Sequence, residues 1–346
     1  MVTAAASVSP LLQACAGSVP ETTPVWLMRQ AGRILKSYRE LKEKTGSIMG
    51  LFKDPVLASE VTLMPVDQLG VDAAILFADI LTPIEPMGCR IDFQPGPVFD
   101  EPVRTAAVIE SLRPVDSRKQ LPHVLETIQR VQAELPAHVP LIGFAGAPIT
   151  LATYMAEGGG AKTFTQFRRL LWSEPTAANQ LLEKLTEVVI DYLLAQIEAG
   201  VQVVQLFDTW VGSLSSAAFK EHALPYLQRI FAALDGTGIP RIYFPLDAAH
   251  LLHQLPSTGA DIFSMDWRID MEEAFEMFPD RPLQGNLDPV TLYGSPATVV
   301  RETREIMKRC QGRPHIFNLG HGVLPDTPLD NVRLAVETVH EFDGER

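Results

Sequence analysis

The chain has 346 residues, 46% of them hydrophobic and 21% charged, which is the balance of a folded globular protein rather than a disordered one. Its formal net charge of −13 argues against nucleic acids and anionic membranes as partners, because both are bound by basic surfaces. No apolar run is long enough to span a membrane. The three cysteines are odd in number and too far apart for a disulfide framework or a zinc site, so we expect a reducing, cytoplasmic setting.

Residues 1–20 are rich in Ala, Ser and Val, and they lack the charged start and long apolar centre of a secretory signal. We expect a loosely ordered N-terminal lead-in, and a weak transit peptide is the alternative. Residues 21–346 contain no linker, no obvious repeat and no low-complexity tract, so we expect them to form one domain.

Short apolar runs, rich in β-branched residues, then alternate with segments that read as helices. The expected strands are residues 24–28, 72–77, 140–146, 201–207, 240–244, 261–265, 282–285 and 315–319. The expected helices are residues 55–68, 120–134, 176–198, 216–234, 249–255, 271–277, 297–308 and 329–342. Residues 88–103 read as a hairpin inserted in the second unit. Eight strand–helix units predict an α/β fold of the (β/α)8 type, a TIM barrel. An open doubly wound sheet is the alternative, although no Gly-rich dinucleotide fingerprint follows the first strand.

In such a barrel the reactive face is formed where the strands end, so polar residues directly after each strand are the candidates for chemistry. Each expected strand is followed by at least one of them. They are Arg29, Arg33, Asp79, Tyr154, Asp208, Thr209, Asp247, His250, Asp266, Trp267, Asn286, Asp288 and His321.

Arg29 and Arg33 are spaced to share one face of a helix, if a helix begins there, and two guanidinium groups on one face favour carboxylates or phosphates. Ordinary ion pairs with Asp or Glu are the structural alternative. Asp79 stands between apolar residues, where an unpaired charge is costly and its pKa is raised. It pairs with one of the two arginines, or it accepts hydrogen bonds from a ligand that carries several N–H groups.

For each remaining candidate residue, a purely structural role is the alternative to a role in binding or catalysis. His321 lies between two glycines, which favours ligand approach, but it could equally pin a loop. Tyr154 is expected in a loop that ends in Gly158 to Gly160, and both Tyr154 and Thr209 could be core hydroxyl groups. The three glycines are interpreted as a hinge rather than a phosphate site. His250 and His253 have no third ligand at a recognisable spacing, so we expect no metal.

Several blocks of the chain resemble the uroporphyrinogen decarboxylase family, and they follow the family's order over nearly the whole length. The N-terminal block is PVWLMRQAGR at residues 24–33. The others are VDAAILFADIL at 71–81, GFAGAP at 143–148 with TYM at 153–155 and EGGG at 157–160, QGNLDP at 284–289, and NLGHG at 318–322.

The resemblance implies a single barrel that binds uroporphyrinogen III, a cyclic tetrapyrrole with eight carboxylates. Such enzymes remove carbon dioxide from its four acetate side chains and give coproporphyrinogen III, without a cofactor. It also implies a homodimer, in which two barrels cover each other's open mouths. Asp79 matches the aspartate that accepts hydrogen bonds from the central pyrrole N–H groups.

The other site residues are implied in the same way. Arg29 and Arg33 match arginines that hold substrate carboxylates, and Arg29 is also a candidate for mediating proton transfer. Tyr154 and His321 match polar positions near the reacting acetate, and Thr209 stands where many relatives have Ser.

Three observations leave alternatives open. After Arg33 the family usually has an aromatic or apolar residue and then Leu-Pro-Glu-Tyr, whereas residues 34–38 here read ILKSY and lack the Pro and the Glu. A zinc-dependent methyltransferase of the same superfamily would need a His-x-Cys pair and a later Cys, and none of the cysteines here has a His two residues before it. A non-catalytic tetrapyrrole-binding protein is the second rival, because of the changes at Lys36 and Ser37.

Overall fold

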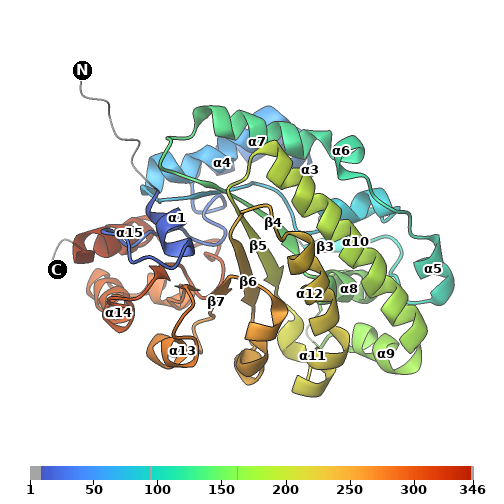
Figure 1. Ribbon diagram of the computed structural model, residues 1–346. Coiled ribbons are helices and arrows are strands. Elements are labelled where there is room, and N and C mark those ends of the chain that lie inside the picture. The colour runs from blue at the N-terminus through green and yellow to red at the C-terminus, as the bar shows by residue number, and fades with distance from the viewer. Residues whose placement is uncertain (1–8, 94–95, 162, 344–346) are drawn as a thin grey trace.

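The computed structural model describes residues 9–93, 96–161 and 163–343. Its centre is a parallel sheet of seven strands that lie side by side in chain order, as the strand–helix alternation predicted (Figure 1). The strands are β1 (Ala74–Ile75), β4 (Leu141–Gly146), β5 (Val203–Asp208), β6 (Arg241–Pro245), β7 (Ile262–Ser264), β8 (Leu283–Gln284) and β9 (His315–Ile316). Because parallel neighbours need a crossover, a helical segment follows each strand and packs on the outside.

The segment expected as the first strand, residues 24–28, forms only an isolated parallel bridge, between Val25 and Phe317. It still lies between the two ends of the sheet. The Asp72 N–H donates to the Val25 carbonyl at 2.8 Å, and the Phe317 N–H donates to the Pro24 carbonyl at 2.9 Å. The sheet is therefore curled, and seven of the eight expected strands are present among the described residues. Pro24 has no N–H to extend a ladder, and the backbone turns at Arg29, where φ is 62°.

Helices cover the outer face of the sheet (Figure 1). The long ones are α4 (Pro55–Leu69), α7 (Pro122–Glu134), α10 (Pro175–Ala199), α14 (Pro296–Arg309) and α15 (Leu329–Asp343). The shorter ones are α2 (Lys36–Thr45), α3 (Ile48–Lys53), α5 (Ala106–Ser111), α6 (Ser117–Gln120), α8 (Pro148–Glu157), α9 (Thr165–Ser173), α11 (Ser216–His222), α12 (Leu224–Ala233) and α13 (Met271–Met277). The 3₁₀ helices are η1 (Thr82–Met87), η2 (Val211–Ser213), η3 (Ala249–Thr258) and η4 (Pro289–Tyr293).

Several helices differ from their predictions for local reasons. The helix expected over 216–234 is two helices, α11 and α12, because Pro225 has no N–H with which to continue α11. The segment expected as a helix over 249–255 is 3₁₀. Residues 148–157, expected as a loop around Tyr154, form α8, which has Pro148 in its first turn and Gly158 in the left-handed conformation at its end.

The expected lead-in is ordered where it is described. Residues 1–8 lie outside the described residues, but α1 (Pro10–Cys15) is a helix whose N-cap is the Ser9 hydroxyl. Leu11 and Ala14 on this helix are fully buried. The burial of this apolar face, which the composition of residues 1–20 did not indicate, holds α1 on the same side of the molecule as α15 (Figure 1).

The inserted hairpin is present as predicted. Strand β2 (Ile91–Phe93) pairs antiparallel with β3 (Pro97–Phe99), and residues 94–95 between them are not described. Val98 forms a bridge with Gly159, just beyond α8. A Cβ at Gly159 would lie 2.4 Å from the Pro97 carbonyl oxygen, so this position needs glycine for close packing of the hairpin rather than for a hinge.

A buried polar layer crosses the inside of the curl. The Trp26 Nε1–H donates to Gln284 Oε1 at 2.9 Å, and Gln284 Nε2 donates to Gln205 Oε1 at 3.0 Å and to Ser264 Oγ at 2.8 Å. All four residues are fully buried. These bonds tie the N-terminal segment to strands on the opposite side, which stabilises the curled form of the sheet.

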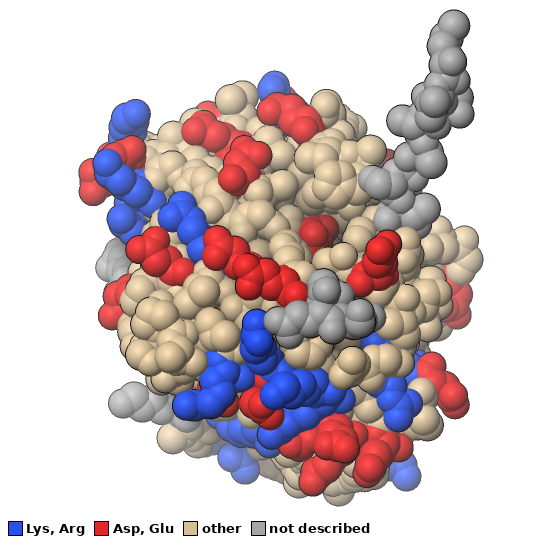
Figure 2. All heavy atoms as spheres, turned by 90° about the vertical axis from the view of Figure 1, so that its left-hand side faces the viewer, with Lys and Arg blue, Asp and Glu red and all other residues tan. Residues whose placement is uncertain are grey.

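The outer surface carries mixed charge. Figure 2 looks at the side that bears α14 and α15, and it shows basic side chains gathered in its lower part with acidic ones beside them. Ion pairs on α14 have this character, for example Lys308 with Glu305 at 2.8 Å and Arg309 with Asp270 at 2.7 Å. Within the described ranges, no helix is both long and apolar enough to cross a bilayer.

Candidate active site

A cleft of ≈ 440 Å³ opens where the strands end. This is the end of the sheet at which the sequence placed the chemistry, and the volume is in the usual range for a small-molecule site. The cleft brings together all six residues predicted for the site. They are Arg29, Arg33, Asp79, Tyr154, Thr209 and His321.

Arg29 lies in a turn that is held in place by the side chain of the next residue, Gln30. The fully buried Gln30 side chain accepts from the Leu27 N–H at 2.9 Å and donates to the Ala73 carbonyl at 3.0 Å, which ties the turn to the start of β1. No helix begins at this point, because α2 starts only at Lys36. The expectation that Arg29 and Arg33 share a helix face is therefore wrong, yet both are exposed and line the cleft.

Neither arginine forms an ion pair with a carboxylate in the part of the chain that the structure describes. The Arg33 backbone carbonyl accepts from Arg39 Nη1 at 2.6 Å, which holds the turn but leaves the Arg33 guanidinium unpaired. The structural alternative, in which these residues form ordinary ion pairs, does not fit this arrangement. Two exposed guanidinium groups in a cleft suit an anionic ligand.

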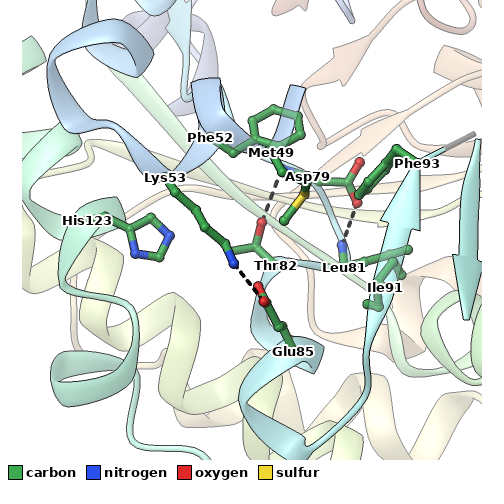
Figure 3. Close-up of a pocket in the computed structure, with 10 residues that line it drawn as sticks. All are labelled: Met49, Phe52, Lys53, Asp79, Leu81, Thr82, Glu85, Ile91, Phe93 and His123. Atoms are coloured by element: carbon green, nitrogen blue, oxygen red, sulfur yellow. Dashed lines mark hydrogen bonds and ion pairs between the residues drawn. The ribbon is translucent and has the colours of Figure 1, made fainter. Parts of the chain in front are cut away.

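Asp79 follows β1 and is held by the turn it makes. Its Oδ1 accepts from the Leu81 N–H at 2.8 Å, and its backbone N–H donates to Thr82 Oγ1 at 3.3 Å (Figure 3). Its Oδ2 has no protein partner among the described residues. Burial raises the pKa of Asp79, while the Leu81 N–H and the charge of Arg29 lower it. One carboxylate oxygen is thus fixed in place, and the other is available to a ligand.

His321 lies in the loop after β9 and lines the cleft. Its ring stacks on Phe244 with centroids 6.2 Å apart. Burial, together with the charges of Arg29 and Arg268, lowers the pKa of His321 to about 4, so the ring is neutral near pH 7. Its Nδ1 is buried without a hydrogen-bond partner among the described residues. A neutral ring with an unsatisfied nitrogen is suited to a hydrogen bond with a ligand.

The glycines beside His321 allow close packing within the protein, rather than access of a ligand. A Cβ at Gly322 would lie 2.4 Å from Arg29 Cδ, and a Cβ at Gly320 would lie 2.3 Å from the Trp267 nitrogen. The Val323 N–H also donates to the Met28 carbonyl at 2.8 Å. The loop after β9 is thus packed directly on the Arg29 turn.

Tyr154 and Thr209 stand on the third side of the cleft. Tyr154 lies on α8, and its ring is 5.6 Å from that of Trp210, which also packs on Phe164 at 4.5 Å. Burial and the charge of Asp79 raise the pKa of Tyr154, so its hydroxyl is a neutral donor. Thr209 follows β5 directly and is half-buried.

Other polar residues after the strands are structural. Asp208 accepts from Thr150 Oγ1 and from the Tyr243 hydroxyl, both at 2.8 Å, and burial raises its pKa to about 6. Asp266 accepts from the Asp247 N–H at 2.7 Å. His250, Asn286 and Asp288 do not line the cleft either, because His250 and Asn286 bond to backbone carbonyls and Asp288 caps η4.

The sequence did not predict the aromatic side chains that form the apolar walls of the cleft. Phe144 and Phe207 at the ends of β4 and β5 contact each other edge to face at 5.6 Å, and Phe52 and Phe93 form another wall. Phe144 and Phe207 lie in segments that were expected as strands, and neither was among the predicted site residues. Their position near the carboxyl ends of two neighbouring strands was the available signal.

The three cysteines do not form a metal centre. All are buried, and burial raises the thiol pKa of Cys15 to about 12 and that of Cys89 to about 11, and raises that of Cys310 as well. A thiolate ligand is therefore disfavoured at each position. Across the described ranges, no three His, Cys, Asp or Glu side chains are grouped as metal ligands.

Comparison with known proteins agrees with this geometry. Residues 7–342 match the family model described as uroporphyrinogen decarboxylase (URO-D). The chain belongs to the uroporphyrinogen decarboxylase family. Among its relatives is the uroporphyrinogen decarboxylase of Geobacter sp. (strain M21), 46% identical over 96% of this chain and 98% of the relative. That of Syntrophotalea carbinolica is 47% identical over 96% of this chain and 97% of its own length.

Solved structures show the same fold. A methyltransferase from Methanosarcina mazei superposes with a TM-score of 0.77 at 23% identity, covering 96% of this chain and 97% of that one. A B12-independent methionine synthase from Shewanella sp. W3-18-1 gives a TM-score of 0.58 at 13% identity, over 83% and 87% of the two chains. At these identities the likeness concerns the fold alone.

The departure from the uroporphyrinogen decarboxylase pattern at Lys36 and Ser37 lies away from the cleft. Lys36 is exposed and pairs with Glu40 at 3.4 Å. The Ser37 hydroxyl accepts from Gln68 Nε2 at 2.9 Å, between α2 and α4. Neither residue lines the cleft, so the changed residues affect helix packing rather than the family's substrate site.

Proposed function

We propose that this chain removes carbon dioxide from the acetate side chains of uroporphyrinogen III and gives coproporphyrinogen III, without a cofactor. The observation that carries the proposal is the charge pattern of the cleft. Its lining contains two unpaired guanidinium groups, Arg29 and Arg33, and one carboxylate, Asp79. A ligand with an anionic rim and N–H donors at its centre complements this pattern, and a reduced tetrapyrrole is such a ligand.

Asp79 is proposed to accept the central pyrrole N–H groups through its free Oδ2. Protonation of a pyrrole α-carbon creates an iminium-like cation conjugated to the acetate methylene. When the bond to the carboxylate carbon breaks, the electron pair flows into this cation, and carbon dioxide leaves. A fixed carboxylate stabilises the positive charge as it develops, which is the kind of electrostatic effect that usually dominates catalysis.

Arg29 and Arg33 are proposed to hold substrate carboxylates through paired N–H donors. Arg29 is also the candidate for mediating proton transfer, because its charge acts on Asp79, Tyr154 and His321 alike. Tyr154, Thr209 and His321 would donate or accept hydrogen bonds near the reacting acetate.

We further infer that residues 24–26 take the place of an eighth strand, so that residues 21–346 form a closed (β/α)8 barrel in one domain. The backbone bonds of Pro24 and Val25 to both ends of the sheet support this. We also propose a homodimer whose two clefts face each other. The buried, unpaired cysteines and the net charge of −13 support a cytoplasmic protein that binds neither nucleic acid nor membrane.

The direct test uses purified protein treated with a chelator. Uroporphyrinogen, generated enzymatically and kept under anaerobic reducing conditions, is added, and the products are separated by carboxylate number. We expect successive loss from eight to four carboxylates at a rate that the chelator does not change. Stoichiometric binding without loss of carbon dioxide would favour a non-catalytic tetrapyrrole-binding protein, and activity restored only by zinc would favour metal chemistry.

A further inference from the structure

A second, smaller pocket of ≈ 20 Å³ lies beside the cleft and shares part of its lining (Figure 3). Four residues line both spaces and separate them, namely Phe52, Asp79, Leu81 and Phe93. The other lining residues belong to the side pocket alone. They are Met49, Lys53, Thr82, Glu85, Ile91 and His123. A space of this size holds about one water molecule, and polar groups at both of its ends could bind it.

The polar groups of the side pocket run from Asp79 toward solvent. Thr82 opens η1 and accepts the Asp79 N–H, so its own hydroxyl hydrogen is free to be donated elsewhere. Glu85 is three residues further along the same 3₁₀ helix, where positions i and i+3 lie on one face. Its carboxylate is 42% exposed and pairs with Lys53 Nζ at 2.6 Å.

His123 of α7 completes the outer end of the pocket (Figure 3). Burial and the charge of Lys53 lower its pKa, while Glu85 raises it. The ionisable groups facing Glu85 thus come from three elements, with Lys53 on α3, His123 on α7 and Asp79 after β1. His123, Lys53 and Glu85 thus stand together around one small, partly apolar space.

The proposed reaction needs protons at the Asp79 end of the cleft. After carbon dioxide leaves each acetate, the exocyclic methylene takes up a proton and the pyrrole α-carbon releases the one it had received, so the net uptake is one proton per acetate. Four protons are therefore taken up per substrate. A macrocycle seated on Asp79 would cover the mouth of the cleft, and an arginine, with a pKa above about 12, is a weak proton donor.

We propose that the side pocket carries these protons, with Glu85 as the residue that exchanges them between solvent and a water molecule next to Thr82. This rests on the decarboxylation proposed above. Glu85 takes a proton from the buffer and passes it to the water molecule, which at the same time releases another of its protons toward the cleft, so that the water and the Glu85 carboxylate are both regenerated. Lys53 positions the Glu85 carboxylate at the pocket entrance.

The test compares Glu85→Gln, Glu85→Asp and the matched control Glu126→Gln. Glu126 lies on α7, is exposed and pairs with Arg130 at 2.8 Å, but it lines neither space. We expect Glu85→Gln to lower kcat by roughly tenfold, below the 10² to 10⁴ of a direct general acid, with KM unchanged. Its rate should rise with the concentration of a small buffer acid such as imidazolium, and its solvent isotope effect should increase. Glu85→Asp should keep most of the rate.

The outcomes separate the two proposals. An inactive wild-type protein refutes the decarboxylation and this route together. An active wild type, with a Glu85→Gln variant that matches Glu126→Gln in kcat and shows no buffer dependence, refutes only the proton route.

Discussion

At the residue scale, the cleft keeps its charges apart instead of pairing them. Asp79 is bonded to a backbone N–H, and the two arginines remain exposed in the described structure. Burial raises the pKa of Asp79, which means that its charged form is held at a cost to stability. An unpaired carboxylate in this setting is more readily explained by ligand binding than by folding.

Replacing Asp79 should therefore affect the rate strongly. Asp79→Asn keeps the size and can still accept the Leu81 N–H, but its NH₂ group would face the pyrrole N–H donors and the negative charge is lost. We expect kcat to fall by about 10² to 10³. Asp79→Glu, which keeps the charge and shifts its position, should retain more activity. A folded Asp79→Asn protein with near wild-type turnover, measured in the anaerobic assay, would refute the role.

The same substitution should stabilise the protein at neutral pH. A carboxyl whose pKa is higher in the folded than in the unfolded protein contributes stability below the unfolded pKa of about 3.8, and this is lost as pH rises through the folded pKa. Asparagine does not ionise, so the Asp79→Asn variant does not lose this stability as the pH rises. Thermal unfolding should give a higher Tm than wild type at pH 7, and the difference should shrink in acid. An equal or lower Tm at pH 7 would contradict the desolvation argument.

Lysine should not replace either arginine. A guanidinium donates two parallel hydrogen bonds to a carboxylate, whereas an ammonium is a single point charge. Losing one charge-assisted bond of about 1.5 kcal/mol corresponds to roughly tenfold. We expect Arg33→Lys to raise KM by this factor and Arg29→Lys to lower kcat more than it raises KM. Arg301→Lys is the control, because Arg301 is exposed on α14 and pairs with the adjacent Glu302. Wild-type kinetics in both cleft variants would show that they are structural.

At the scale of elements, the site is assembled by loops that pack on one another. The loop after β9 lies on the Arg29 turn, and the hairpin of β2 and β3 is tied to the end of α8 through Gly159. Small residues at these contacts let two backbones approach closely. The sequence interpretation of glycines as hinges or as room for ligand overlooked this packing role.

Gly322→Ala tests the contact between the two loops. Its Cβ would lie 2.4 Å from Arg29 Cδ, so the arginine side chain must move. A misplacement of about 1 Å can cost around 10²-fold in rate, and we expect a loss of this order in kcat/KM. Gly160→Ala is the control, because a Cβ there meets nothing within 4 Å. If Gly322→Ala were as active as Gly160→Ala, the reaction would not depend on the present position of the Arg29 side chain.

At the scale of the whole molecule, a protein with a net charge of −13 binds a polyanion through a local reversal of charge. Two arginines and one aspartate line the cleft, while the outer surface shown in Figure 2 carries a group of basic side chains with acidic ones beside it. Surface charges are screened within about 10 Å at 0.1 M salt, so the cleft's own charges dominate what a bound ligand meets.

The open cleft leads us to expect a homodimer. Its aromatic walls, which include Phe52 and Phe93, would be covered if two clefts faced each other. Sedimentation equilibrium at micromolar concentration should give the mass of two chains, and mild dissociation should lower activity together with the dimer fraction. A fully active monomer at these concentrations would contradict the expectation.

The sequence by itself determined the order of strands and helices and the end of the sheet at which the site lies. This is possible because apolar periodicity and a parallel α/β sheet leave few arrangements. It also identified Asp79, Arg29, Arg33, Tyr154, Thr209 and His321 as cleft residues, since the residues after parallel strands meet at one face. The resemblance of motifs such as PVWLMRQAGR supplied their roles.

Only the tertiary structure decided which post-strand polar residues face the cleft. Asp208 ends β5 and Asp79 follows β1, yet Asp208 accepts hydrogen bonds from Thr150 and Tyr243 inside the fold, whereas Asp79 keeps one oxygen for the cleft. It also replaced the expected helix at Arg29 by a turn held through Gln30, and it reduced the first strand to a bridge. Such outcomes depend on hydrogen bonds between residues distant in the chain, which local periodicity does not encode.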